Sequence, residues 1–289
     1  MQKLVFKKAT SQPIIIAGPC LAESWELLDE TADLLKGLEK KLGFQLIFKS
    51  SFDKANRTSL GNVRSAGMDK SLDWFGRIKD KYSVPFLTDV HETAQVAGVA
   101  EICDVLQIPA FLCRQTDLVV AAVQTGRAVN IKKGQFLSPE ATQYIFDKAK
   151  AAALSEKLPV NVALTERGFS FGYGDLIVDM RSFPVLAQNK EAAVIFDITH
   201  SVQKPSASAI KGQSGAERHF CPILARSAAA TGYTDGFFLE VHATPKNAKS
   251  DKESQLSFAQ CSTLLEQLIP LWKSSKALTA SDQEFRSDG

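Results

Sequence analysis

The sequence predicts one α/β domain with the (β/α)8 barrel fold, spanning residues 1–289. Three observations predict this fold. Short runs rich in β-branched and aromatic residues recur about eight times, segments of helical length separate them, and nearly every run ends in polar or charged residues. No Pro-, Gly- or Ser-rich linker and no low-complexity tract divides the chain, so we expect a single core.

The predicted strands and helices alternate along the whole chain. The expected strands are Ile14–Ala17, Gln45–Phe48, Pro85–Thr88, Val105–Ile108, Ala128–Ile131, Val160–Leu164, Ala193–Phe196 and Gly236–Leu239. The clearest expected helices are Glu23–Leu42, Met68–Tyr82 and Ser138–Lys157. A doubly wound open sheet is the competing fold, but it usually has a glycine-rich phosphate turn after its first strand. The sequence Gly18-Pro19-Cys20 is not such a turn, which favours the barrel.

The two ends of the chain have simpler expectations. The apolar run Leu4-Val5-Phe6 is a candidate for a short N-terminal β-hairpin that caps the bottom of the barrel. Residues 278–289 are mostly polar, so we expect a frayed tail.

Composition excludes several classes of protein. Lys+Arg 34 against Asp+Glu 32 leaves a formal charge of +2, too balanced for a protein that binds nucleic acid or an anionic membrane. No apolar run approaches the roughly 20 residues of a membrane helix, and the N-terminus has no apolar signal core. We therefore expect a cytoplasmic protein. Its 5 cysteines are scattered and odd in number, which argues against a disulfide framework.

The segment from Phe48 to Ser59 is the most informative part of the sequence. It follows an apolar strand and carries Lys49, Lys54, Asn56 and Arg57 together with several hydroxyl side chains. Cationic groups beside hydroxyl and amide donors suit a ligand with a phosphate at one end and hydroxyls along it. A solvated basic loop is the alternative, but the place at the end of a barrel strand favours ligand binding.

Cationic residues also end other predicted strands. Lys49, Arg114, Lys132 and Arg167 follow four different strands, and in a barrel the carboxyl ends of the strands meet at one rim. Four cations there suit a small substrate that bears both carboxylate and phosphate. We expect ligand binding rather than ion pairing, because carboxylate partners look too few on this rim. Lys54, Asn56, Arg57 and Thr58 lie farther out and suit a second phosphate.

A metal site is a further hypothesis. Cys20, His200, Glu240 and Asp251 offer a thiolate, an imidazole and two carboxylates, which fit Fe(II), Zn(II) or Mn(II). Their wide spacing is weak evidence, and a buried apolar Cys20 is the default interpretation. His91 remains open between a general base and a core histidine.

Ordered motifs resemble the 3-deoxy-D-manno-octulosonate 8-phosphate synthase family over nearly the whole chain. The matching motifs are Ala17–Cys20, Phe48–Ser59, Leu87–Glu92, Gln107–Leu112, Arg114–Leu118, Asn130–Phe136, Glu166–Gly168, Phe196–Ser201 and Phe238–His242. The resemblance implies a (β/α)8 barrel, usually a homotetramer, that condenses phosphoenolpyruvate with arabinose 5-phosphate and releases phosphate. The product leads to the inner sugar of lipopolysaccharide.

Site residues follow from the same resemblance. It implies that phosphoenolpyruvate is held by Lys49, Gln107, Ala110, Arg114, Lys132 and Arg167, and arabinose 5-phosphate by Lys54, Asn56, Arg57 and Thr58. The resemblance puts Asp89 near the reacting centre, and we expect Lys49, Asp89, His91 and His200 among the catalytic residues. Family members with cysteine at the position of Cys20 depend on a divalent metal, which implies the ligands Cys20, His200, Glu240 and Asp251.

Two other functions are considered as alternatives. Enzymes that use erythrose 4-phosphate typically read Lys-Pro-Arg-Thr where this chain has Lys54-Ala55-Asn56-Arg57-Thr58, and the extra residue favours the longer sugar. A non-catalytic sugar-phosphate sensor could keep Arg57 and Lys132. Such a sensor would not need both the four candidate metal ligands and Asp89, so their presence together favours an enzyme.

Overall fold

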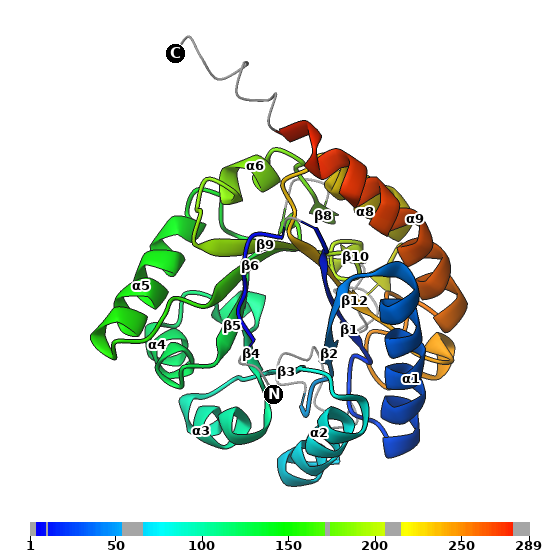
Figure 1. Ribbon diagram of the computed structural model, residues 1–289, viewed down its shortest axis with the longest axis horizontal. Helices are drawn as coiled ribbons and strands as arrows, with labels where there is room; N and C mark the ends of the chain where they lie inside the picture. The colour runs from blue at the N-terminus through cyan, green and yellow to red at the C-terminus, as the bar shows by residue number, and fades with distance from the viewer. Residues whose placement is uncertain (1–3, 10, 54–65, 171–173, 206–214, 280–289) are drawn as a thin grey trace.

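Eight parallel strands close into a barrel in the computed structural model, which confirms the predicted fold (Figure 1). The structure describes residues 4–9, 11–53, 66–170, 174–205 and 215–279. In order around the barrel, the strands are β1 (Ile14–Gly18), β12 (Gly236–Glu240), β9 (Ala192–Asp197), β6 (Val162–Glu166), β5 (Ala128–Lys132), β4 (Val105–Ile108), β3 (Phe86–Asp89) and β2 (Gln45–Lys49). The ring closes because β1 pairs with both β2 and β12.

Helices surround the barrel on its outside (Figure 1). The described α-helices are α1 (Trp25–Leu42), α2 (Met68–Tyr82), α3 (Thr93–Ile102), α4 (Thr116–Gln124), α5 (Thr142–Ser155), α6 (Ser182–Leu186), α8 (Cys221–Ala230) and α9 (Phe258–Lys276). Single 3₁₀ turns form η1 (Ala110–Leu112), η2 (Arg218–Phe220) and η3 (Pro245–Asn247). Helix α1 begins where the Ser24 hydroxyl accepts the Leu27 N–H at 3.2 Å, and it ends at Gly43 in the left-handed region.

Several predicted elements begin later than expected; the helix predicted from Glu23, for example, starts at Trp25, and the strand predicted from Pro85 starts at Phe86. The helix predicted from Ser138 starts at Thr142, because residues before it form a turn in which the Ser138 hydroxyl accepts the Ala141 N–H at 3.3 Å. The strand predicted from Val160 starts at Val162. Asn161, just before it, instead bonds the N-terminal segment, with its Oδ1 accepting the Phe6 N–H at 2.7 Å.

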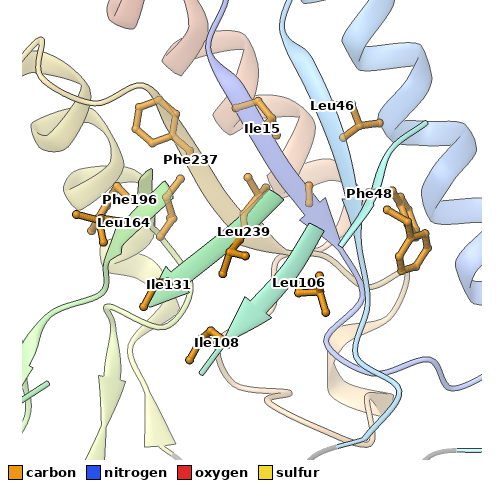
Figure 2. Packing of buried hydrophobic residues seen from close by; sticks show 14 of the residues in the cluster. Ile15, Leu46, Phe48, Leu106, Ile108, Ile131, Leu164, Phe196, Phe237 and Leu239 are labelled. Carbon is orange, nitrogen blue, oxygen red and sulfur yellow. The ribbon is translucent and has the colours of Figure 1, made fainter. Parts of the chain in front are cut away.

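Alternate side chains of each strand point to two separate apolar layers, as a period of two requires. Ile14, Ile16 and Phe238 belong to a small cluster inside the barrel. Ile15, Leu46 and Phe237 belong to the larger layer between strands and helices (Figure 2). Because the interior is filled by side chains, this part of the barrel is a packed core, and chemistry is left to the strand ends.

The N-terminal segment crosses one end of the barrel (Figure 1). Phe6 is 3% exposed and joins the inner cluster, and the Ala9 N–H donates to Asp235 Oδ1 at 2.9 Å, just before β12. The segment therefore covers the bottom, as expected. The predicted β-hairpin is wrong for the described residues 4–9, which form no strand. Their polar atoms bond side chains of the barrel floor instead of a second strand.

Two short hairpins that the sequence did not indicate follow β6 and β9. They are β7 (Phe169–Ser170) with β8 (Leu176–Ile177), and β10 (Gln203–Lys204) with β11 (Gly215–Ala216). Among the described helices, none combines the length and the apolar character that crossing a bilayer would require. Most of the tail predicted to fray, residues 280–289, lies outside the described residues.

Candidate active site

Buried polar side chains gather at the carboxyl ends of the barrel strands, above the apolar inner cluster. They include Lys49, Asp89, Gln107, Asn130, Lys132, Glu166, Arg167, Asp197 and Glu240, none more than 6% exposed. Charged groups are rarely buried this completely unless they are paired or hold a ligand. The strand ends therefore form the candidate site, as the sequence predicted.

Lys49, at the end of β2, is paired with Glu240, at the end of β12. The Lys49 Nζ lies 2.5 Å from Glu240 Oε1, and each side chain is 1% exposed. The ammonium group also donates to the Cys20 carbonyl at 3.2 Å. These contacts place Lys49 beside the predicted metal ligands Cys20 and Glu240.

Lys132, at the end of β5, is paired with Asp197, at the end of β9. Its Nζ lies 2.7 Å from Asp197 Oδ2 and 3.7 Å from the centre of the Phe238 ring. Burial lowers the pKa of Lys132, although Asp197 and Glu240 oppose that shift. Burial alone would raise the pKa of Asp197, but His200 and Lys132 outweigh it and hold that pKa well below its ordinary value. Asp197 is therefore a fixed negative charge that orients both neighbours.

One sequence-based expectation about this rim is wrong. We expected too few carboxylates to pair with the cations, yet Lys49 and Lys132 both have a buried carboxylate partner. The partners come from β12 and β9, which are distant in sequence from the lysines but lie only one strand away from them around the barrel, beyond β1 and β6. The cations are held in place by these pairs before any substrate enters.

Arg167 follows β6 and is 5% exposed. Its Nη2 donates to Gln203 Oε1 at 2.7 Å, while its Nη1 has no hydrogen-bond partner among the described residues. Burial lowers the pKa of Arg167, with Asp197 and Glu166 acting in the opposite direction. A guanidinium remains charged even so, and a buried guanidinium with an unused N–H suits an anionic ligand.

Asp89 takes part in a polar layer that the sequence did not reveal. Its carboxylate accepts the Ser51 hydroxyl at 2.6 Å and the Gln107 side-chain amide. The layer continues from Gln107 Oε1 to Asn130 Nδ2 at 2.8 Å, and from Asn130 Oδ1 to the Thr165 hydroxyl at 2.6 Å. The signal in the sequence was an uncharged polar residue inside an apolar strand, which alone does not distinguish a site from a core hydrogen bond.

Three of the four predicted metal ligands converge. One donor atom each from Cys20, Glu240 and Asp251 lies within 4.8 Å of the others, and the Cys20 Sγ is 3.0 Å from Asp251 Oδ2. The fourth, His200, lies beside them with its Nε2 3.6 Å from Glu240 Oε2. Its other ring nitrogen, Nδ1, lies 2.8 Å from Asp197 Oδ2, which fixes the ring orientation.

The donor set fits a divalent transition metal. A thiolate, an imidazole and two carboxylates are ligands that Zn(II), Fe(II) and Mn(II) accept. Asp251 reaches the cluster from the loop between η3 and α9 and has φ of 46°, a left-handed conformation unusual for a residue with a side chain. Strain of this kind is concentrated at functional sites.

Other predicted site residues lie apart from this centre or outside the described residues. Arg114 is exposed and lines a surface pocket with Leu137 and Tyr144; among the described residues no hydrogen bond or ion pair joins it to the other three predicted cations. The ring of His91, half-buried, packs edge-on against Phe52 with centroids 6.1 Å apart. Ala110 is buried at the start of η1. Lys54, Asn56, Arg57 and Thr58 lie outside the described residues.

Comparison with known proteins shows the family to which the chain belongs. A family model described as the DAHP synthetase I family matches residues 4–278. A Brucella abortus (strain S19) protein named 2-dehydro-3-deoxyphosphooctonate aldolase is 48% identical over 271 residues, covering 93% of this chain and 95% of that protein. A Wolinella succinogenes protein of the same name is 47% identical over 264 residues, covering 89% of this chain and 98% of that protein. The chain therefore belongs to the DAHP synthetase I family, and within it to the group of 2-dehydro-3-deoxyphosphooctonate aldolases.

Proposed function

We propose that this protein condenses phosphoenolpyruvate with D-arabinose 5-phosphate and water, giving 3-deoxy-D-manno-octulosonate 8-phosphate and phosphate. The enzyme is then a transferase that supplies the inner-core sugar of lipopolysaccharide. One observation carries the proposal: the buried cations Lys49, Lys132 and Arg167 stand at the same strand ends as a Cys–Glu–Asp cluster. The relatives named 2-dehydro-3-deoxyphosphooctonate aldolase support the choice of reaction.

Phosphoenolpyruvate carries a carboxylate and a phosphate, and the three buried cations offer complementary charge. Gln107 and Ala110, on and after β4, are proposed to line the same pocket. Arg114 stays a prediction as a fourth cation, with its side chain exposed on the outer rim. Lys54, Asn56, Arg57 and Thr58 are proposed to hold arabinose 5-phosphate, with Arg57 on its phosphate.

The proposed reaction forms one carbon–carbon bond and one carbon–oxygen bond, the latter from water, and breaks the bond between C2 and the phosphate oxygen. C3 of phosphoenolpyruvate attacks the sugar aldehyde, whose oxygen takes up a proton and becomes a hydroxyl. Water adds at C2, and the resulting tetrahedral centre expels phosphate and becomes a ketone. Lys49 and Lys132 would stabilise the charge that develops, because they are fixed in a site largely withdrawn from water.

Proton transfer is assigned to residues at the same rim. Lys49 would act as an acid toward the aldehyde oxygen and not as a Schiff-base nucleophile. Asp89, held by Ser51 and Gln107, would lie beside the reacting carbons, and His91 remains a candidate base. His200, oriented by Asp197, would serve both the metal and the reacting groups.

Cys20, His200, Glu240 and Asp251 are proposed to hold a divalent ion, Fe, Zn or Mn. When bound, such an ion would polarise a carbonyl oxygen or lower the pKa of a bound water. The residues themselves would orient the sugar aldehyde against the anion pocket. We also propose that the chain works as a homotetramer in the cytoplasm, with small molecules and no nucleic acid as partners.

The test measures phosphate release from phosphoenolpyruvate plus arabinose 5-phosphate, before and after treatment with a chelator, then with Mn(II) restored. We expect activity to be lost and recovered. Erythrose 4-phosphate is the comparison substrate, because the family description includes DAHP synthetases. Faster turnover of erythrose 4-phosphate than of arabinose 5-phosphate would instead support the rival function, condensation of phosphoenolpyruvate with erythrose 4-phosphate.

Cys20→Asn tests the metal assignment separately. Co(II) serves here as a spectroscopic probe in place of the native ion. When a thiolate binds Co(II), the complex has a charge-transfer absorption band in the near ultraviolet. We expect Cys20→Asn to abolish that band and metal binding while some activity survives. Cys261→Ser is the matched control, because Cys261 is equally buried but lies in α9. Metal binding at full affinity by the Cys20→Asn protein would remove Cys20 from the ligand set.

A further inference from the structure

Gln203, on β10, stands between the anion pocket and the metal cluster. Its side-chain Oε1 accepts from Arg167 Nη2 at 2.7 Å, and its Nε2 donates to Asp251 Oδ1 at 3.1 Å. An arginine can only donate and a carboxylate can only accept, so this orientation of the amide is the one that satisfies both neighbours. A single neutral side chain thus contacts both predicted sub-sites.

The amide is suited to this place because its neighbours have opposite charges. Asp251 is close enough to Arg167 to oppose the burial-induced fall in its pKa. With an apolar residue at position 203, the cation and the carboxylate would lose their shared partner and would be drawn toward each other. With glutamine at position 203, Asp251 Oδ2 lies 3.0 Å from the Cys20 Sγ. Arg167 Nη1 then has no hydrogen-bond partner among the described residues and can bind a ligand.

We propose that Gln203 is a positioning residue that couples the two sub-sites, so that a divalent metal and phosphoenolpyruvate each bind more tightly when the other is present. The inference rests on the proposed function for the identity of these two ligands. A ligand on Arg167 or on Asp251 orders the shared amide, and the second ligand is then spared the loss of that side-chain freedom. Hydrogen bonds in a chain also polarise one another. The coupling must be equal in both directions.

The backbone of β10 holds Gln203 without help from its side chain. Gln203 pairs with Ala216 of β11 in an antiparallel ladder, and the Glu217 N–H donates to the Val202 carbonyl at 3.0 Å. Lys204, the next residue, contacts other partners: its Nζ lies 3.4 Å from both Asp175 and Glu217. A substitution of Lys204 therefore alters the same hairpin but leaves the hydrogen bonds of Gln203 to Arg167 and Asp251 in place.

The experiment compares the wild-type protein with Gln203→Leu and the matched control Lys204→Gln. The dissociation constant for Mn(II) is measured by calorimetry on the chelator-treated protein, without and with saturating phosphoenolpyruvate. We expect phosphoenolpyruvate to tighten Mn(II) binding about fivefold or more in wild type and Lys204→Gln. In Gln203→Leu we expect that factor to be at least about threefold smaller.

Two results would overturn the proposal: no effect of phosphoenolpyruvate on Mn(II) affinity in wild type, or an undiminished factor in Gln203→Leu. If the leucine variant is unfolded, Gln203→Asn replaces it, since one missing methylene prevents the amide from reaching both partners. The assay needs no turnover. A protein that binds both ligands cooperatively but releases no phosphate would refute the proposed reaction and leave the coupling standing.

Discussion

Lys133 and Glu166 form an ion pair that is almost completely withdrawn from water. The Lys133 Nζ lies 3.6 Å from Glu166 Oε2, with side-chain exposures of 1% and 0%. Burial lowers the pKa of Lys133 and raises that of Glu166, and each partner partly offsets the shift of the other. Glu166 Oε1 also accepts the backbone N–H groups of Arg167 and Gly168, at 2.9 and 2.6 Å. The pair thus fixes the turn that presents Arg167.

Replacing one partner of this pair should be strongly destabilising. Lys133→Met leaves the Glu166 carboxylate buried without its cation, so we expect a loss of about 3–5 kcal/mol in the free energy of unfolding, measured with urea. The double variant Lys133→Met with Glu166→Gln should recover much of that loss. The single variant should also raise the KM for phosphoenolpyruvate. A single variant as stable as wild type would contradict this account of the turn.

Gly18→Ala should damage both stability and activity. A Cβ at this position would lie 1.9 Å from the Lys49 carbonyl oxygen, so the ends of β1 and β2 would have to separate. We expect a loss of at least about 1–3 kcal/mol in unfolding free energy and a fall in kcat, because Cys20 and Lys49 would both move. Gly37→Ala in α1 is the control: its Cβ would meet nothing within 4 Å, and thermal unfolding should show a small gain in stability.

Phe6→Ala tests the floor of the barrel. Phe6 is 3% exposed within the inner apolar cluster, so its truncation should cost about 3–5 kcal/mol of unfolding free energy. Steady-state kcat should stay unchanged at a temperature where the variant is folded, because the active site lies at the opposite end. Val5→Ala, at a position 42% exposed, should change little. Equal effects of the two substitutions would mean that the segment is not docked as described.

Asp29 should contribute stability that depends on pH. Burial alone would raise its pKa, but hydrogen bonds from Lys81 and Tyr82 outweigh it, so the folded pKa lies below the ordinary 3.8. A depressed carboxyl pKa stabilises the fold above the unfolded value and loses that effect as pH falls through the folded value. The difference in melting temperature between wild type and Asp29→Asn should therefore be present at pH 6 and shrink below about pH 4. A melting-temperature difference that grows as the pH falls would contradict a lowered pKa for Asp29.

The sequence predicted the barrel strands well because runs such as Ile14–Ala17 have no other interpretation once they recur between amphipathic segments. Helix α2 was predicted with its observed bounds, Met68–Tyr82, because Gly67 precedes it and an apolar stripe defines it. The N-terminal hairpin was wrong because Phe6 is apolar for a different reason: it fills the barrel floor. The local sequence pattern alone does not distinguish an apolar residue of a strand from an apolar residue that fills the barrel floor.

Residues of the candidate site could be proposed from the sequence where their charge is unusual for a strand end, as with Lys49 and Lys132. Glu240 was predicted as a metal ligand, but neither Glu240 nor Asp197 was predicted as a lysine partner, because these pairs join segments that are distant in sequence and that only the barrel brings together. Gln203 could not be predicted at all. A neutral amide in a short hairpin has no charge, period or motif, and the role proposed for it depends on two neighbours brought together only by folding.

The pairing of β1 with both β2 and β12 has a consequence for synthesis of the chain. Ile14 must wait for Gly236 to emerge from the ribosome, about 220 residues later, which takes roughly 10–45 s at an elongation rate of about 5–20 residues per second. Until then one edge of β1 has no native partner, and an unpaired strand edge is a site of aggregation. The last barrel strand to be synthesised completes the pairing of the first, so this edge of β1 stays without its native partner until synthesis is nearly finished.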